Sequence, residues 1–473
     1  MAASTVGTII EWYDFALYGA ASALVINELF FPTAGPVIGT LAAFATFAVG
    51  FFARPLGGVV IGHYGDRLGR KPALIFTVVL MGLSTVLIGL LPTYEQIGVW
   101  APALLVLLRL LQGFGAGAEL AGAITYIAEY TPASKRAFYT AIPNGATAAG
   151  LLLATGAFSI ISFLPEEQLL SWGWRLPFVA SVVILLVAIF IRQRLQESPA
   201  FREELSEGED PPRLPVREVL ADRPRDVLCG FLSVSGHNAN AYVLNTFALS
   251  YITATLGLAQ GVGLLALFVA AGAGIICAPL FSMLADRIGR RPVFIGGATF
   301  IALFAFPFFY LLDTKSPALV VLAMTLGYGI GFGATSGAQG AFLSELFETR
   351  YRYTGISLAR ELNGVAIAGP TPFIAAALVA LAGGSPWFVA IYVIFCQSSR
   401  SSASFTPEGS THPSRIPSKN SATRAWSAVS GEQANEDPRR PTSSVVVRRT
   451  ESTPRASRKA GDQFEVKLCL AGP

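Results

Sequence analysis

Twelve apolar stretches, most of them near 20 residues or longer, restrict the folds open to this chain more than any other feature of its sequence. A helix rises 1.5 Å per residue, so about 20 apolar residues cross the roughly 30 Å hydrocarbon core of a bilayer. Only 14 % of the 473 residues are charged, whereas about a quarter are charged in soluble domains. The sequence therefore predicts an all-α polytopic membrane protein. The stretches cover residues 5–29, 38–63, 73–91, 99–121, 138–164, 174–192, 227–256, 262–285, 293–312, 317–343, 354–382 and 386–397.

The first and last stretches differ from the others. The first carries Glu11 and Asp14 and continues to about Phe30, so we expect a spanning helix and not a cleavable signal. Eleven stretches are long enough to span. The twelfth, 386–397, has 12 residues and rises only about 18 Å, so helix twelve looks truncated.

Positive charge is distributed unevenly between the connections, which predicts an orientation. Arginines and lysines follow the second, fourth, eighth and tenth stretches and are frequent in 193–226, whereas 30–37, 92–98 and 257–261 contain none. By the positive-inside rule, the N-terminus and connection 193–226 are expected to be cytoplasmic.

Two charged motifs occur twice. GHYGDRLGRK at 62–71 returns as SMLADRIGRR at 282–291, and AEYTPASKR at 128–136 returns as SELFETRYR at 344–352. The second pair gives an offset of 216, and that offset also carries Gly113, Gly115 and Gly117 onto Gly329, Gly331 and Gly333.

These matches predict two six-helix halves, residues 1–192 and 227–397, joined by a linker over 193–226. Charges that occur in both halves sit at cytoplasmic helix ends. They are either solvated loop residues or, as we favour, a network that latches the cytoplasmic face and breaks during function. The predicted latch residues are Asp66, Arg67, Arg70, Glu129, Arg136, Asp286, Arg287, Arg290, Glu345 and Arg352.

Charges that lack a repeat partner need another explanation, because a charge inside a span is costly unless it is paired or faces water. Glu11 and Asp14 are three residues apart and project from one helical face. Asp14 lies roughly 15 Å along its helix, whereas Glu11 is either solvated at the cytoplasmic end or functional. The unrepeated set is Glu11, Asp14, Arg54, Arg109, Glu119, Arg360 and Glu361.

Several motifs carry a resemblance to a known family. The D-R-x-G-R-[RK] loops and the glutamate–arginine pairs resemble the major facilitator superfamily, in its sugar-porter-like branch. More narrowly, the chain resembles the metabolite:proton symporters, which move organic acids and zwitterionic osmolytes with protons. The motifs are EWYDF in the first stretch, ATFAVGFFARPLGG (45–58), RLLQGFGAGAE (109–119), SWGWRLPF (171–178) and QESPAF (196–201).

The resemblance implies roles for the unrepeated charges. Asp14 matches the first-helix acid linked to proton binding, and Arg109 matches a helix-four arginine that can face it. When substrate or movement removes the arginine, the acid binds a proton, and this exchange couples proton to solute. Glu11 and Glu119 are further proton-coupling candidates, and Glu119 could instead pair with Arg54.

Substrate contacts are expected from two arginines. Arg109 can bind an anion, and Arg54 can bind a carboxylate with two donors, although it could instead be a structural cap near the Pro55 kink. Adjacent Arg360 and Glu361 point to different faces; Glu361 is not a fixed family feature and could bear on specificity. Candidate cavity residues, each more often packing, are Tyr18, Asn144, Asn240 and Asn245.

The sequence departs from the family after residue 397. From Ser398 it becomes rich in Ser, Pro, Thr and Arg, and 398–473 is predicted to be a low-complexity, disordered tail. It is either a natural basic tail that touches lipid or nucleic acid, or the product of a shifted reading frame that removed the end of helix twelve. The abrupt change favours the second, which puts transport by this chain in doubt.

The preferred function is a proton-coupled symporter for a small organic acid or zwitterion, a multi-pass protein of the plasma (inner) membrane. An uncoupled facilitator or exporter, an inactive carrier and a non-conducting sensor stay open. The absence of H-E-x-x-H, P-loop and serine-elbow motifs argues against an enzyme. Four cysteines without paired spacing predict neither disulfide nor metal site. We expect no cofactor and no nucleic-acid partner, with the bilayer and protons as partners and a monomer by analogy.

Overall fold

The structure is a computed structural model that describes residues 2–68, 70–117, 136–193, 216–347 and 352–403. These residues belong to one compact unit, 1–407; a second unit, 408–473, lies outside them, as does nearly all of the predicted tail. The described part is helical throughout and contains no strand, which confirms the all-α prediction.

The N-terminal helices follow the predicted stretches closely. Short helices follow the long helices of the first, third and fifth spans. The elements are α1 (Ala2–Leu24), α2 (Ile26–Phe30), η1 (Pro32–Ala34), α3 (Gly35–Leu68), α4 (Arg70–Leu90), α5 (Tyr94–Ile97), α6 (Trp100–Ala116), α8 (Arg136–Ile161), α9 (Glu166–Gln168), η3 (Leu169–Gly173) and α10 (Arg175–Gln193).

In the C-terminal part, three spans contain internal π-helical turns, and a short helix lies within the predicted linker. The elements are α12 (Val216–Asp222), α13 (Pro224–Tyr242), η4 (Val243–Phe247), α14 (Ala248–Ser250), η5 (Tyr251–Thr255), α15 (Gln260–Ile288), α16 (Arg290–Asp313), α17 (Pro317–Leu326), η6 (Gly327–Phe332), α18 (Gly333–Leu346), α19 (Arg352–Asn363), η7 (Gly364–Ala368), α20 (Thr371–Leu381) and α21 (Trp387–Ala403). Helix α21 has 17 residues, so it continues past the apolar run that ended at residue 397.

By length and composition, five of the described helical segments can cross a membrane. A sixth qualifies if Glu166–Gly173 and Arg175–Ile191, which meet at 42°, form one broken span. This is fewer than the eleven predicted, because a span needs about 18 residues in one helix and α6, for example, is described only to Ala116. The five are Pro32–Ile61, Gln260–Ile288, Arg290–Asp313, Pro317–Leu346 and Thr354–Leu381.

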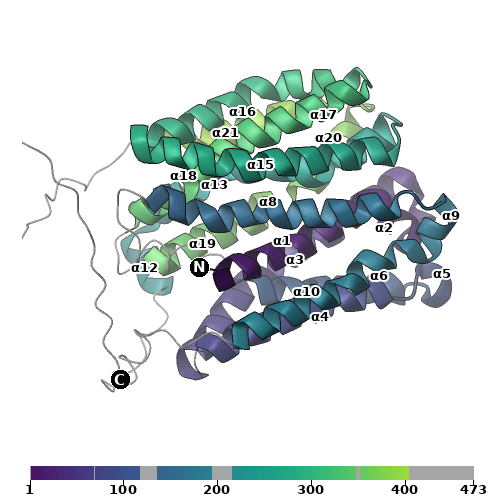
Figure 1. The fold of residues 1–473 in the computed structure, drawn as a ribbon, viewed down its shortest axis with the longest axis horizontal. Coiled ribbons are helices and arrows are strands. Elements are labelled where there is room, and N and C mark those ends of the chain that lie inside the picture. Colours follow the sequence, from purple (N-terminus) through teal and green to yellow (C-terminus); the bar gives the residue numbers. More distant parts are fainter. Residues whose placement is uncertain (1, 69, 118–135, 194–215, 348–351, 404–473) are drawn as a thin grey trace, which may run out of the picture. The chain divides into compact units, whose positions relative to one another are not determined.

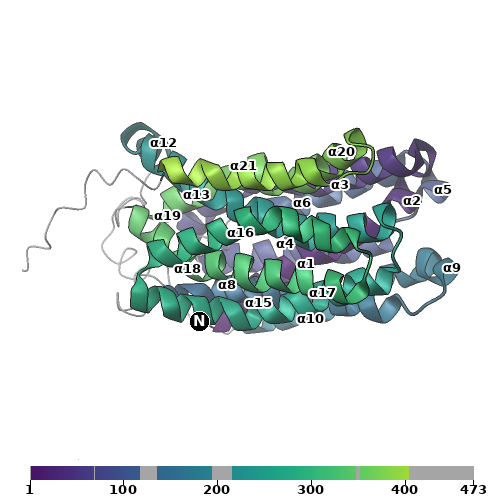
Figure 2. The same cartoon turned by 90° about the horizontal axis from the view of Figure 1, so that it is seen from above.

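Helices from the two halves meet along three lines. Helix α8 packs against α1 on one side and against α15 and α18 on the other, as Figures 1 and 2 show. Helix α3 contacts α19, η7 and α20, while α1 contacts η4. The interface between halves is therefore built mainly by α1, α3 and α8 on the N-terminal side.

Helices α3 and α6 approach each other so closely that only glycine fits between them. A Cβ on Gly113 would lie 1.8 Å from the Gly50 carbonyl oxygen, and one on Gly117 would lie 1.9 Å from the Arg54 carbonyl oxygen. These contacts bring two buried arginines, Arg54 on α3 and Arg109 on α6, into the same layer of the bundle.

Candidate functional site

Arg54 joins the two halves of the sequence through ion pairs. Its Nη2 donates to Oε1 of Glu11 on α1 at 2.6 Å, and its Nε donates to Oε2 of Glu361 on α19 at 3.1 Å. The side chain of Arg54 is 9 % exposed, that of Glu11 is 1 % and that of Glu361 is 12 %. Glu11 is thus a buried, paired acid, and the alternative of a solvated acid at the cytoplasmic end does not fit.

Aromatic rings surround this ion pair. The Arg54 guanidinium carbon lies 5.2 Å from the ring centre of Phe15 and 5.4 Å from that of Phe51. Tyr242 of α13 meets Phe51 edge-on at 5.5 Å and stacks on Trp12 at 6.1 Å. Cations are attracted to ring faces at such distances, so the rings stabilise the buried guanidinium and could do the same for a cationic ligand.

Arg109 is completely buried and is held by neutral groups. Its Nη1 donates to Oε1 of Gln112, and its Nη2 donates to the Phe47 carbonyl at 3.0 Å. The guanidinium lies 4.0 Å from the ring centre of Tyr18, and its Nε has no hydrogen-bond partner among the described residues. A buried donor without a partner is costly, so Arg109 retains capacity to bind an acceptor.

Asp14 lies beside this group without forming an ion pair within the described part of the chain. Its side chain is 1 % exposed, and Oδ2 has no described hydrogen-bond partner. The side chains of Thr85 and Gln112 hydrogen-bond to its carboxylate, and the positive charge of Arg109 attracts it. The negative charge of Glu11 repels it. The counter-charge expected from Arg109 therefore reaches Asp14 through space and through intervening polar groups.

Gln112 and Thr85 connect the two charged residues, and the sequence interpretation missed them. Gln112 accepts from Arg109 and donates from Nε2 to Oγ1 of Thr85 at 2.7 Å. Both are completely buried or nearly so. The available signal was the position of Gln112 one helical turn after Arg109, on the same face of α6.

The other residues predicted to line a cavity do not lie together in the structure. Tyr18 lies under Arg109 and its hydroxyl hydrogen-bonds to that of Thr46 at 2.6 Å. Asn245, in η4, is buried beside Tyr328, and its Oδ1 has no described hydrogen-bond partner. The side chain of Asn144 and the whole of Glu119 lie outside the described part.

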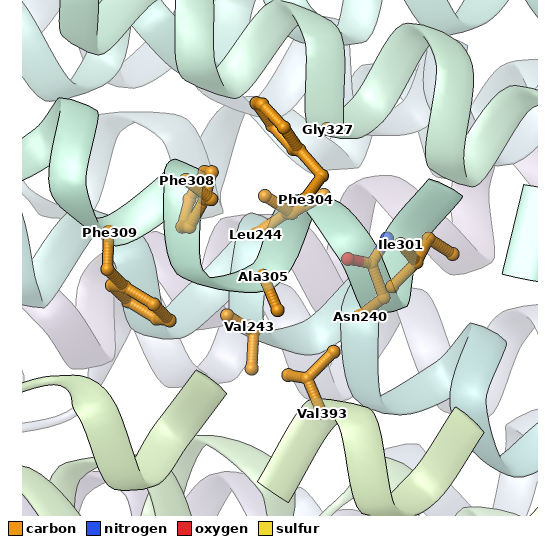
Figure 3. A pocket seen from close by; sticks show the side chains of 10 residues that line it. All are labelled: Asn240, Val243, Leu244, Ile301, Phe304, Ala305, Phe308, Phe309, Gly327 and Val393. Carbon is orange, nitrogen blue, oxygen red and sulfur yellow. The ribbon is translucent and has the colours of Figure 1, made fainter. Parts of the chain in front are cut away.

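Asn240 faces a different cavity, shown in Figure 3. Among the lining residues it is the amide side chain. None of the buried charges described above contributes to it, so it is separate from the charged site. Its lining is Asn240, Val243, Leu244, Ile301, Phe304, Ala305, Phe308, Phe309, Gly327 and Val393.

Part of the predicted cytoplasmic latch is present in the C-terminal half. Arg290 pairs with Glu345 across α16 and α18, and also with Asp286 at 3.7 Å. Arg287 is exposed. The structure does not describe the side chains of Asp66, Arg67, Arg70, Glu129, Arg136 and Arg352.

Comparisons with known proteins agree on one family. The sequence model of the Major Facilitator Superfamily matches residues 5–370. The Shikimate transporter of Escherichia coli is 42 % identical over 400 residues, covering 83 % of this chain and 90 % of the relative. The Proline/betaine transporter of the same organism is 34 % identical over 386 residues, covering 80 % of this chain and 77 % of the relative.

Solved structures show the same fold. The partially occluded inward-open form of the xylose transporter XylE from E. coli aligns with a TM-score of 0.66 at 19 % identity. The alignment covers 86 % of this chain and 97 % of that one. A crystal structure of a D-xylose-proton symporter aligns with the same TM-score at 21 % identity.

Proposed function

Because this chain belongs to the major facilitator superfamily, whose members are membrane transporters and not enzymes, we propose that it is a proton-coupled symporter. It takes up a small organic acid or zwitterion across the plasma membrane by alternating access, with its N-terminus on the cytoplasmic side. The observation that supports this most is the buried, incompletely hydrogen-bonded Asp14 beside Arg109.

Asp14 is the proposed proton site. A carboxylate sealed from water is costly as an anion unless a cation and hydrogen bonds offset that cost. Arg109, Gln112 and Thr85 provide this compensation. When a substrate carboxylate binds Arg109, Asp14 loses part of its counter-charge and takes up a proton. The neutral acid then moves with α1 through the closed intermediate at lower cost than the anion.

The proposed substrates share one carboxylate. Arg54 and Arg109 provide guanidinium donors suited to a carboxylate, and the relatives are named for shikimate and for proline and betaine, each with a single carboxylate. The rings of Trp12, Phe51 and Tyr242 beside Arg54 can contact a carbon ring or a quaternary ammonium group. We therefore favour monocarboxylates of either kind over dicarboxylates and sugars.

Uptake into proteoliposomes tests the proposal. Radiolabelled shikimate, proline and glycine betaine are offered in turn, with and without an inward-directed proton gradient. We expect the gradient to drive accumulation of at least one solute, a protonophore to abolish accumulation, and Asp14→Asn to retain only downhill flux. Glu28→Gln, an exposed acid in α2, is the matched control and should accumulate solute like the unaltered chain.

The alternatives give different results. Accumulation that persists with a protonophore, or in Asp14→Asn, contradicts proton coupling through this residue. Flux that only equilibrates the solute indicates a facilitator. Binding of a solute without any flux indicates a sensor or an inactive carrier.

A further inference from the structure

Glu361 is an acid from the C-terminal half that contacts an arginine of the N-terminal half, and the proposed function gives it no role. It lies on α19, and Arg54 lies on α3. The two residues are 307 positions apart in the sequence. Their contact therefore exists only when the two halves are together at this level.

The two acids on Arg54 share one edge of its guanidinium. Glu11 accepts from Nη2 and Glu361 accepts from Nε, the two donors that a single carboxylate engages in a side-on bidentate pair. Each acid thus uses half of a surface that matches one substrate carboxylate. Glu361 is the more exposed of the two acids, at 12 % against 1 %, so it is the easier one to displace.

The charges around Glu361 are balanced. Glu11, Arg54 and Arg360 act on its carboxylate, and the Tyr242 hydroxyl lies in the same group. The two carboxylates and the two guanidinium groups give this group of residues a net charge of zero, because the Tyr242 hydroxyl is uncharged. An entering carboxylate adds one negative charge to a largely buried site, and such a charge is costly without compensation. One proton on an acid of this group restores neutrality.

We propose that Glu361 acts as an internal substitute for the substrate carboxylate and as a second proton-binding group. Before substrate binds, Glu361 occupies Nε of Arg54 and holds α3 against α19. The substrate carboxylate replaces it there, Glu361 takes up a proton from the aqueous side, and the link between the halves is released. This inference rests on the proposed function for its substrate class, whereas the link between the halves can be tested separately.

Transport by the full chain in proteoliposomes tests the substitution. KM for shikimate, proline and glycine betaine is measured across pH in the unaltered chain, Glu361→Gln, Glu361→Asp and the exposed control Glu95→Gln. Where ionised Glu361 competes with substrate, KM rises with pH by up to about tenfold per unit. We expect Glu361→Gln to lower KM and to lose this rise, and Glu361→Asp and Glu95→Gln to keep it.

Hydrogen–deuterium exchange of α3 and α19 tests the link without any transport. Glu361→Gln should exchange faster in both helices than the unaltered chain, and Glu361→Asp should lie between them. If none of the three solutes is transported, the proposed substrate class fails while exchange still decides the link.

An unchanged pH profile of KM in Glu361→Gln overturns the substitution, and unchanged exchange in α3 and α19 overturns the link. Should Glu361→Gln fail to fold, Glu361→Asp carries the exchange measurement. Exchange in α3 and α19 identical to that of the unaltered chain then overturns the proposal.

Discussion

The two halves of this transporter share a sequence repeat, but they place their irregularities and their charges differently. In the C-terminal half, three spans contain the internal π-helical turns η4, η5, η6 and η7. The N-terminal counterparts α1, α6 and α8 contain none among the described residues, and the turn η3 of that half lies before α10. These N-terminal helices and α3 instead carry Glu11, Asp14, Arg54 and Arg109.

Packing at one pair of repeated glycines differs in the same way. A Cβ on Gly113 would overlap the backbone of α3, whereas one on its repeat partner Gly329 would lie 3.4 Å from the Ala273 Cβ. The N-terminal half therefore holds its charges on tightly packed helices. The C-terminal half presents π-helical turns, which are deformable and frequent at functional sites, to α1 and α3. We infer that most of the buried charges lie in the first half, with Glu361 as the contribution of the second, and that bending is concentrated in the second.

The largest expected effect comes from removing the arginine that the two halves share. Arg54→Gln removes the ion-pair partner of the buried Glu11, and breaking a buried ion pair on one side costs about 3–5 kcal/mol. We expect a large fall in the thermal midpoint of the detergent-solubilised protein. Arg287→Gln, an exposed arginine of α15, should leave the midpoint unchanged. Equal midpoints for both variants would show that water already stabilises Glu11.

A smaller effect tests the packing difference between repeat partners. In Gly113→Ala the new methyl group overlaps the Gly50 carbonyl, so α3 and α6 must separate, and overpacking of this kind costs about 1–3 kcal/mol or more. Gly329→Ala adds the same atom with only ordinary contacts and should be tolerated. Thermal midpoints of the two variants give the comparison. A similar loss in both would mean that the halves are packed alike.

The sequence was sufficient for the all-helical membrane fold but not for the partners of the charges. Apolar stretches of spanning length predicted that fold, because the thickness of the hydrocarbon core sets the length of a spanning helix. The partner of Arg54 could not be predicted, since Glu361 is 307 residues away and nothing local specifies which acid it meets. Gln112 and Thr85 were missed because uncharged polar residues are common in spans and rarely stand out.

Helical geometry explains the position of Asn240, which the sequence suggested as a cavity residue. It lies in a polar run that also contains residues near the interface between the halves. Side chains two residues apart on an α-helix, such as those of Asn240 and Tyr242, point in directions that differ by about 200°. Tyr242 faces Trp12 across the interface, so Asn240 points into the C-terminal pocket instead. Knowing which residue of a span faces the other half requires the packing itself.

The smallest expected effect compares two buried glutamines, one in each half. Gln112→Leu removes the bonds to Arg109 and Thr85 and leaves buried polar groups unsatisfied, at about 1–3 kcal/mol. Gln339 on α18 is also buried, but its Nε2 has no described partner, so Gln339→Leu should cost less or even stabilise. Thermal midpoints measure the stability of both variants. The pH dependence of uptake distinguishes a structural role from a role in proton binding, because only Gln112→Leu should alter the titration of Asp14. A shifted pH profile in Gln339→Leu would mean that the titration of Asp14 does not depend on the hydrogen bonds of Gln112 in particular.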